Sequence, residues 1–275
     1  MCVYAKDSPE ALIQCLGSIL TQTVIPDELI IVKDGPLTEA LDAVLDALRF
    51  PNELNIISLP ENVTLGPARV EGVKAAKHDW IAIMDSDDVC SPDRFRKQID
   101  MIKANPKLGL IGGQIAEFVD NPDNTATTRT VPTSHNEIIK FAKKRNPFNH
   151  MTVMLRREAA IKAGNYRYFP WFEDYDLWAR MITNGVVCAN HPDILVNARI
   201  GEGMYKRRRG IAYVKSEWRM QKQLRTLGVI SGLRLICNAA VRIPVRILPA
   251  ACIGAVYRRV ARGKVNNSER SINEE

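Results

Sequence analysis

Three carboxylates follow a short apolar run in the first half of the chain. The run extends from Trp80 to Met84, and Asp85, Asp87 and Asp88 come after it. Such a run predicts a buried strand, in which side chains two residues apart point the same way. We therefore expect Asp85 and Asp87 to project together from the carboxyl end of this strand, where open α/β sheets bind ligands. Oxygen ligands at that edge suit a Mg²⁺ or Mn²⁺ ion that carries a substrate phosphate.

The same acidic residues have a second interpretation. Ser91 and Pro92 have the pattern of a helix N-cap followed by proline at the first helical position. Asp87 and Asp88 would then only precede a helix start. From this motif alone, both interpretations remain open.

Strands and helices alternate through the first half of the chain and would position these groups. The spacing predicts strands that end at Tyr4 and Asp34, a strand over Leu54–Leu59, and helices that begin at Ser8-Pro9, before Leu41 and at Gly66-Pro67. Repeated β-α units imply a parallel sheet with right-handed crossovers. The groups at the carboxyl ends of its strands would then share one crevice. The chain has neither a Gly-x-Gly-x-x-Gly motif after its first strand nor a P-loop, which disfavours dinucleotide dehydrogenases and P-loop NTPases.

The second half has a mixed pattern. Leu108–Phe118 and Met151–Leu155 are expected to be extended, and Ser134–Lys144 to be helical. A further helix is expected to begin at Glu173 and Asp174 and to end at Asn184-Gly185. These two acids are candidates for chemistry, but acids also stabilise a helix start through its dipole.

Composition limits the class of protein. The chain has 275 residues, 46% of them hydrophobic, which suits one large α/β domain or a domain with an appendage. None of the six cysteines forms a Cys-x-x-Cys pair, so neither a zinc site nor a redox motif is expected, and thiols in a reducing cytosol are the default interpretation. We find no signal-peptide pattern and no run of about 20 apolar residues for a spanning helix.

The positive charge is concentrated near the C-terminus. Residues 205–264 hold 15 Lys and Arg and a single acid, although the net charge of the whole chain is only +7. Apolar residues with spaced arginines fill Leu227–Val260, and Pro244 and Pro249 are expected to divide it into short pieces. Such pieces suit a membrane interface, where arginine reaches the headgroups. A helical cap on the main domain is the alternative. Nucleic-acid binding is not expected, because few aromatic residues accompany the basic ones.

Several motifs occur together in one order. They are Asp34-Gly35-Pro36, then Asn62 with Gly66, Ala68 and Arg69, then Asp85-Ser86-Asp87-Asp88, then Glu173-Asp174-Tyr175-Asp176-Leu177-Trp178. This ordered set resembles the family 2 glycosyltransferases, especially bacterial enzymes of the amylovoran type that build exopolysaccharide or O-antigen repeat units. The resemblance implies a GT-A fold: an α/β, Rossmann-like domain with a mixed, mainly parallel sheet and flanking helices, followed here by C-terminal amphipathic helices.

The resemblance also implies a division of the chain. Residues 1–220 would form the glycosyltransferase domain, with a nucleotide-binding half over 1–105 and an acceptor half over 106–220. Residues 221–264 would be a basic, membrane-associating helical extension, and residues 265–275 a disordered tail. Family members usually have several more apolar residues before the position of Cys2, so we expect the true start of the first strand to lie upstream.

Roles at the donor follow from matching positions. Tyr4, Asp34 and Arg69 would hold the uracil and ribose of a nucleotide sugar. Asp85 would face the ribose or a metal-bound water. Asp87 would ligate the Mg²⁺ or Mn²⁺ ion that bridges the diphosphate.

Roles at the acceptor follow in the same way. Asp174 would be the general base, with Glu173 and Trp171 beside it. His150 is a further substrate-binding candidate, and a buried, hydrogen-bonded histidine is the alternative. Arg208 is a candidate for binding phosphate, and a solvated or lipid-facing charge is the alternative.

The resemblance therefore implies an inverting transfer of a hexose. The donor would be a UDP-sugar and the acceptor a polyprenyl-diphosphate-linked saccharide, on the cytoplasmic face of an anionic membrane. A catalytically inactive nucleotide-sugar-binding scaffold is the alternative function. The sequence does not define the donor sugar, the linkage or the oligomeric state.

Overall fold

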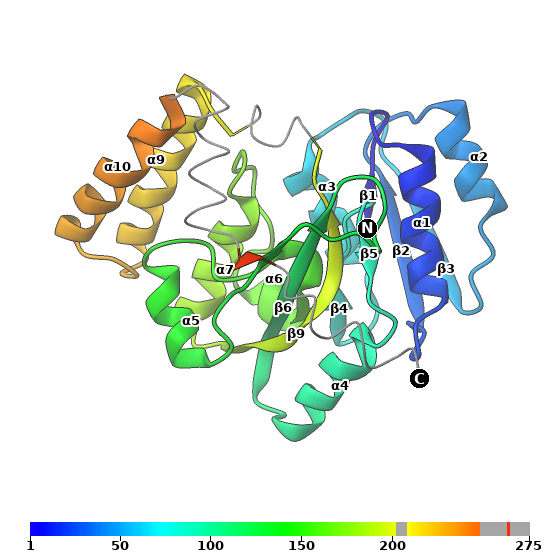
Figure 1. Ribbon diagram of the computed structural model, residues 1–275, viewed down its shortest axis with the longest axis horizontal. Coiled ribbons are helices and arrows are strands. Elements are labelled where there is room, and N and C mark those ends of the chain that lie inside the picture. Colours follow the sequence, from blue (N-terminus) through cyan, green and yellow to red (C-terminus); the bar gives the residue numbers. More distant parts are fainter. Residues whose placement is uncertain (202–207, 248–262, 265–275) are drawn as a thin grey trace.

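A parallel sheet forms the N-terminal part of the protein. The computed structural model describes residues 1–201, 208–247 and 263–264 (Figure 1). Strands β1 (Cys2–Val3), β2 (Glu28–Lys33) and β3 (Glu53–Ser58) pair in the order β1-β2-β3. β3 pairs with β2 over its whole length, but β1 covers only the last two residues of β2.

Helix α1 (Pro9–Leu20) shows how local sequence starts these elements. The Ser8 hydroxyl caps it by accepting a hydrogen bond from the Ala11 N–H at 3.2 Å, and Pro9 occupies the first turn. Its buried face packs Leu12 and Leu16 into the core. The helix predicted from Ser8-Pro9 is confirmed. Helices α2 (Glu39–Ala47) and α3 (Leu65–Ala75) complete the β-α units.

A second, mixed sheet forms the middle of the protein. Its strands are β4 (Trp80–Ala82), β5 (Val89–Cys90), β6 (Leu108–Phe118), β7 (Thr127–Arg129), β8 (Met154–Arg156), β9 (Val187–Arg199) and β10 (Gly263–Lys264). β6 is buried along its whole length, and it pairs parallel with β9 and antiparallel with β7 and β8. β4 lies at the end of this sheet and pairs with β8.

The remaining helices pack around this sheet and beyond it. They are α4 (Arg94–Ala104), α5 (His135–Ala142), the 3₁₀ turn η1 (His150–Thr152), α6 (Arg157–Lys162), α7 (Glu173–Thr183), α9 (Ile211–Thr226) and α10 (Gly232–Ile247). In Figure 1, α9 and α10 form a hairpin at the end of the molecule opposite α1 and α2. Residue 220, the expected boundary, lies within α9. No helix in the described ranges is both long and apolar enough to cross a membrane.

Two local predictions are wrong. Ser91 does not cap a helix, because α4 begins only at Arg94, and the Ser91 hydroxyl instead donates to the Ile194 carbonyl at 3.0 Å. Pro244 does not interrupt the C-terminal helix, because it falls in the last turn of α10. The Arg246 carbonyl beyond it accepts a hydrogen bond from the Gly210 N–H at 3.1 Å. Pro249 and the expected tail at 265–275 lie outside the described residues.

Candidate active site

Asp34 ends β2 and holds a neighbouring loop. Its carboxylate is buried and accepts hydrogen bonds from the Asn62 side chain at 3.0 Å and from the Val63 N–H at 2.7 Å. Gly35 follows with φ +86°, and a Cβ there would lie 2.7 Å from the Asn62 nitrogen. The Asp-Gly-Pro motif therefore fixes the approach of the 62–63 loop to the carboxyl end of the sheet.

Arg69 joins the two acidic motifs. This α3 residue donates from Nη2 to Asp85 Oδ1 and from Nη1 to Glu173 Oε1, at 3.0 Å in both cases. Its side chain is 10% exposed, and Glu173 lies 104 positions away along the chain. Because little water surrounds these ion pairs, they are screened weakly. A buried guanidinium also needs carboxylate partners to offset the cost of losing water.

The electrostatics of Asp85 reflect this contact. Burial alone would raise the pKa of the Asp85 carboxyl, but the His150 imidazole and the Arg69 guanidinium outweigh burial and lower this pKa. Asp85 is therefore a carboxylate at neutral pH, paired with a permanent cation. It lies three residues beyond the end of β4, because the strand expected over Trp80–Met84 ends at Ala82.

Three carboxylates gather beside this ion pair. Asp87 is exposed, yet displacement of water by the surrounding protein, together with the charges of Asp85 and Asp7, raises the pKa of its carboxyl to about 6. Asp7 accepts hydrogen bonds from the Ser86 hydroxyl at 2.8 Å and from the Tyr4 N–H at 3.1 Å. Asp88 has a different role, because it is buried and accepts a hydrogen bond from the Arg199 N–H at 2.8 Å.

These groups suit a divalent cation that arrives with its substrate. Within the described ranges, no three ligand-type side chains are grouped so that protein alone would hold a metal. Mg²⁺ is usually bound by one or two carboxylates together with substrate phosphates. The mutual repulsion that raises the pKa of Asp87 is one that a bound cation would relieve. The donor set therefore fits Mg²⁺ or Mn²⁺, and Asp87 is the carboxylate of this set that is exposed.

Glu173 and Asp174 open α7 beside Arg69. Asp174 Oδ2 accepts a hydrogen bond from the Asn146 side chain at 2.7 Å. Burial raises the pKa of Glu173, Arg69 opposes that rise, and the charge of Asp174 adds to it. The two acids therefore do more than stabilise the start of the helix. Glu173 pairs with Arg69, and the side-chain amide of Asn146 orients Asp174.

His150 is buried in an aromatic cluster. Its ring lies 6.0 Å from the ring centroids of both Tyr166 and Trp178. Within the described residues, neither ring nitrogen of His150 has a hydrogen-bond partner, and the Tyr166 hydroxyl and Trp178 Nε1 also lack one. Burial, together with the charge of Arg69, lowers the pKa of His150 to about 4. His150 is thus buried as in the alternative interpretation, but it is not hydrogen-bonded to the described protein.

Trp171 and Arg208 lie toward the C-terminal hairpin. Trp171 is 43% exposed, has φ +66° and packs against the ring of Tyr213 on α9 at 5.3 Å. Backbone strain of this kind is common at functional sites. Arg208 is half-buried, and no hydrogen bond or ion pair joins it to the acidic groups described above. The structure thus brings together every predicted site residue from the two acidic motifs but does not connect Arg208 to them.

Three polar residues of the site escaped the sequence interpretation. Asp7 directly precedes Ser8, the N-cap of α1. The sequence pattern there indicates only the start of a helix and not the contact between Asp7 and Ser86. Asn146 and Arg199 lie in segments without a recognisable motif, and each acts through a contact distant in sequence.

Together, the mixed α/β fold, the acidic groups beyond the strand ends and the arginine between them suit a glycosyltransferase. Residues 1–164 match Glycosyl transferase family 2, and the chain belongs to this family. It is 42% identical to an uncharacterized glycosyltransferase of Haemophilus influenzae, over 95% of this chain and 97% of that protein.

Two further relatives have more specific names. The amylovoran biosynthesis glycosyltransferase AmsE of Erwinia amylovora is 37% identical, over 95% of this chain and 97% of that protein. The UDP-Gal:alpha-D-GlcNAc-diphosphoundecaprenol beta-1,3-galactosyltransferase of Escherichia coli is 36% identical, over 95% of each chain.

Solved structures confirm the expected GT-A fold. S. aureus TarS 1-349, in complex with UDP-GlcNAc, superposes with a TM-score of 0.65 at 13% identity, over 89% of this chain and 71% of that one. The mannosyltransferase PcManGT of Pyrobaculum calidifontis, in complex with GDP-Man and Mn²⁺, gives a TM-score of 0.60 at 14% identity, over 94% and 78%.

Proposed function

We propose that this family 2 enzyme transfers a hexose from a UDP-sugar to a polyprenyl-diphosphate-linked saccharide, with inversion, in bacterial exopolysaccharide or O-antigen synthesis. The names of two relatives that match it over nearly its full length support this assignment. The observation that carries it is the contact of Arg69 with both Asp85 and Glu173. This contact places the proposed donor carboxylates and the proposed acceptor acids at one point, and it disfavours the scaffold alternative.

The donor would lie at the carboxyl ends of β1, β2 and β4. Tyr4 and Asp34 would contact the nucleoside with Arg69, and Asp85 would face the ribose. Asp87 would hold the Mg²⁺ or Mn²⁺ ion. When bound, this cation supplies positive charge that stabilises the nucleotide diphosphate as it leaves.

The acceptor hydroxyl would be activated by Asp174. A sugar hydroxyl is a poor nucleophile at neutral pH, so a base that accepts its proton during attack accelerates transfer by roughly 10²–10⁴-fold. The hydrogen bond from Asn146 orients this carboxylate. As the new glycosidic bond forms on the face opposite the leaving group, the bond from the anomeric carbon to the diphosphate oxygen breaks. Glu173, Trp171 and His150 would line the acceptor side.

The surface of α10 supports a peripheral position on the inner face of the cell membrane. Its outward residues form one apolar stripe made of Leu233, Ile236, Cys237, Ala240, Val241 and Pro244. Residues 218–247 contain no acid. An exposed apolar helix face in a segment rich in basic residues and without acids suits a layer of anionic lipid. A lipid-linked acceptor would be presented at that surface.

Calorimetric titration of UDP in the presence of Mn²⁺ tests the donor site. Wild type should bind UDP only with the metal, and Asp87→Asn should abolish this metal-dependent binding. Asp93→Asn is the matched control, because Asp93 is exposed and caps α4 without a side-chain hydrogen bond. UDP binding that needs no metal, or that survives Asp87→Asn, would contradict the assignment of Asp87. If folded wild type does not bind UDP at all, the uridine donor is wrong.

A further inference from the structure

Two side chains of α10 hold the turn that follows α5. Asn238 donates from Nδ2 to the Lys143 carbonyl at 2.9 Å. Arg242 donates from Nη1 to the Lys144 carbonyl at 3.0 Å. The last carbonyls of a helix have no partner within that helix, and a cation placed there also meets the negative end of the helix dipole. The C-terminal hairpin of α9 and α10 therefore caps α5 from 95 and 98 positions further along the chain.

This turn leads directly to the proposed catalytic base. Asn146 follows Lys144 by two residues, and its Nδ2 donates to Asp174 Oδ2 at 2.7 Å. Its Oδ1 accepts a hydrogen bond from the Phe148 N–H at 3.2 Å, which sets the direction of the amide. The other oxygen of Asp174 accepts from the Tyr175 N–H at 2.6 Å. The position of the turn therefore determines where one of the two oxygens of this carboxylate is held.

Arg242 is itself fixed by a buried carboxylate. Glu217 of α9 is fully buried and accepts hydrogen bonds from Arg242 Nε at 2.6 Å and from Nη2 at 2.9 Å. Gln221 donates to Glu217 at 3.2 Å and accepts from Asn238 at 2.9 Å. A planar guanidinium that uses two nitrogens on one carboxylate leaves its third nitrogen little freedom. The packing of α9 against α10 thus directs Nη1 at the Lys144 carbonyl.

The same hairpin contacts the residues that lead into α7. The Ser216 hydroxyl donates to the Pro170 carbonyl at 2.6 Å. The ring of Tyr213 packs against those of Trp171 and Phe172, with centroids 5.3 and 5.4 Å apart. The proposed base lies two residues beyond Phe172. The hairpin therefore holds the chain on two sides of the base, at the turn after α5 and at the segment before α7.

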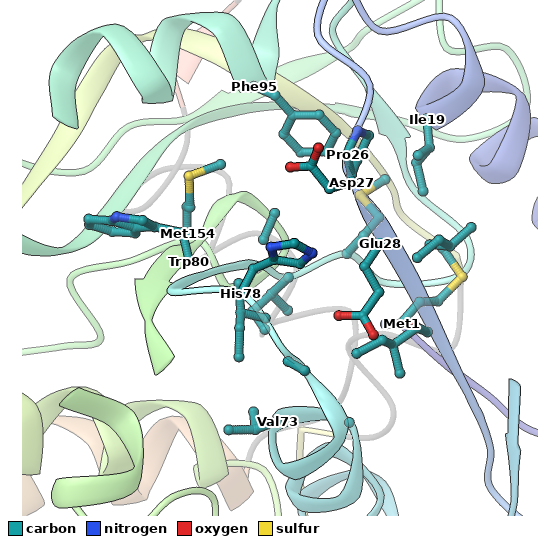
Figure 2. Close-up of a pocket in the computed structure, with 18 of the residues that line it drawn as sticks. Met1, Ile19, Pro26, Asp27, Glu28, Val73, His78, Trp80, Phe95 and Met154 are labelled. Carbon is teal, nitrogen blue, oxygen red and sulfur yellow. Dashed lines mark hydrogen bonds between the residues drawn. The ribbon is translucent and has the colours of Figure 1, made fainter. Parts of the chain in front are cut away.

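The other acid of this pair is supported from a different side. Its partner Arg69 lies on α3, which borders a cavity of about 450 Å³ (Figure 2). Among the described lining residues, none belongs to α5, α7, α9 or α10. An element beside a cavity makes fewer contacts on that side. The cavity thus adjoins the Arg69 contact of Glu173, whereas the contacts that orient Asp174 lie on the side of the hairpin.

We propose that the C-terminal hairpin positions the catalytic base, with Asn238 and Arg242 as positioning residues that act through Asn146. This inference rests on the proposed function, because it takes Asp174 as the base. Within the described chain, both residues contact the turn and neither is hydrogen-bonded to Asp174. A misplacement of about 1 Å at a reacting group can cost roughly 10²-fold in rate. A displaced turn should therefore lower turnover and leave donor binding unchanged.

Arg242→Lys and Asn238→Leu test the proposal in the protein without substrate. Lysine keeps a positive charge opposite Glu217 but lacks the planar fork, and leucine has nearly the size of asparagine but no donor. Either variant should speed exchange of the Lys144 N–H, which donates to the Phe141 carbonyl at 2.8 Å, by at least about tenfold. Amides of β6 should keep their wild-type rates. An equal acceleration in β6 would show that the hairpin only stabilises the fold, and would overturn the proposal.

The side-chain amide of Asn146 reports on the base itself. Its NMR signal, identified by its absence in Asn146→Ala, should shift in both α10 variants. Arg225→Lys is the matched control, because Arg225 is exposed on the same hairpin, and it should leave the signal in place. An Asn146 signal that is unchanged in Arg242→Lys and in Asn238→Leu would overturn the proposal.

Turnover distinguishes this proposal from the proposed function. With a UDP-hexose and a polyprenyl-diphosphate-linked saccharide, both α10 variants should lower kcat by about tenfold or more and keep the wild-type affinity for UDP with Mn²⁺. In an Asn146→Ala background, the same substitutions should lower kcat by less than about twofold, since they act through a contact that is already lost. Losses that multiply would overturn the proposal. If the wild type consumes no UDP-hexose, the proposed function is wrong, and amide exchange and NMR still decide whether the hairpin positions Asp174.

Discussion

The wild type is expected to become less stable in mild acid because of His150. Replacing His150 with phenylalanine should prevent this part of the loss. The imidazole is buried against Tyr166 and Trp178, and burial lowers its pKa to about 4. In the unfolded chain, histidine has a pKa of about 6.5. As the pH falls, the unfolded chain therefore takes up this proton first. Stability that is present above about pH 6.5 is lost progressively as the pH falls to about 4.

The size of this loss follows from the two pKa values. Each pKa unit corresponds to about 1.4 kcal/mol, so the full effect is roughly 3 kcal/mol. Between about pH 7 and about pH 4.5, proton linkage gives about 2 kcal/mol for this group. Phenylalanine keeps an aromatic ring in the cluster but cannot bind a proton, so this contribution should disappear.

Urea unfolding followed by tryptophan fluorescence measures the effect. The free energy of unfolding is determined by linear extrapolation at both pH values for wild type and for His150→Phe. Carboxylates whose pKa His150 does not affect are present in both chains, so their contributions cancel in the difference, whereas Asp85 is coupled to His150. His78→Phe is the matched control, because His78 is exposed. A pH dependence of His150→Phe within about 0.5 kcal/mol of the wild-type value would refute the reasoning.

Three further predictions concern catalysis and packing. Asp174→Asn should lower turnover by roughly 10²–10⁴-fold without changing metal-dependent UDP affinity, and an equal loss of affinity would argue against a role as base. Glu217 is fully buried and pairs with two arginines of α10. Glu217→Gln should therefore lower the free energy of unfolding in urea by about 3 kcal/mol. An unchanged urea midpoint would contradict this expectation. A Cβ at Gly112 would lie 2.8 Å from the Phe148 ring, whereas one at Gly201 meets nothing within 4 Å. Gly112→Ala should therefore cost about 1–3 kcal/mol in the same assay and Gly201→Ala should cost little, and similar costs would contradict the packing.

Local patterns predicted most of the elements because the relevant physics is local. The serine-proline cap and the apolar spacing that predict α1 act within a few residues of each other. The extended segment expected over Leu108–Phe118 is β6 without change, and this strand is buried along its whole length. The family and the fold, both inferred from ordered motifs, are confirmed by the comparisons.

The incorrect predictions have one physical cause, which is contact between residues that lie far apart in the sequence. β4 stops at Ala82 although the apolar run continues to Met84, because strand length is set by pairing with β8. Ser91 bonds a carbonyl 103 positions away instead of starting a helix. In the site, spacing identified the candidate carboxylates, but it did not indicate that one arginine would pair with both Asp85 and Glu173.

The shared position of Arg69 has a thermodynamic consequence. One guanidinium balances a carboxylate on the proposed donor side and another on the proposed acceptor side. With the proposed roles, a donor nucleotide that draws this cation toward itself would weaken its hold on Glu173, and a change at Glu173 would in turn alter what the donor encounters. The two substrates would then be coupled by a free energy that linkage requires to be equal in both directions. If the bound donor changes the affinity for the acceptor by some factor, the bound acceptor must change the affinity for the donor by the same factor. Arg69 would determine whether that factor raises or lowers the affinity.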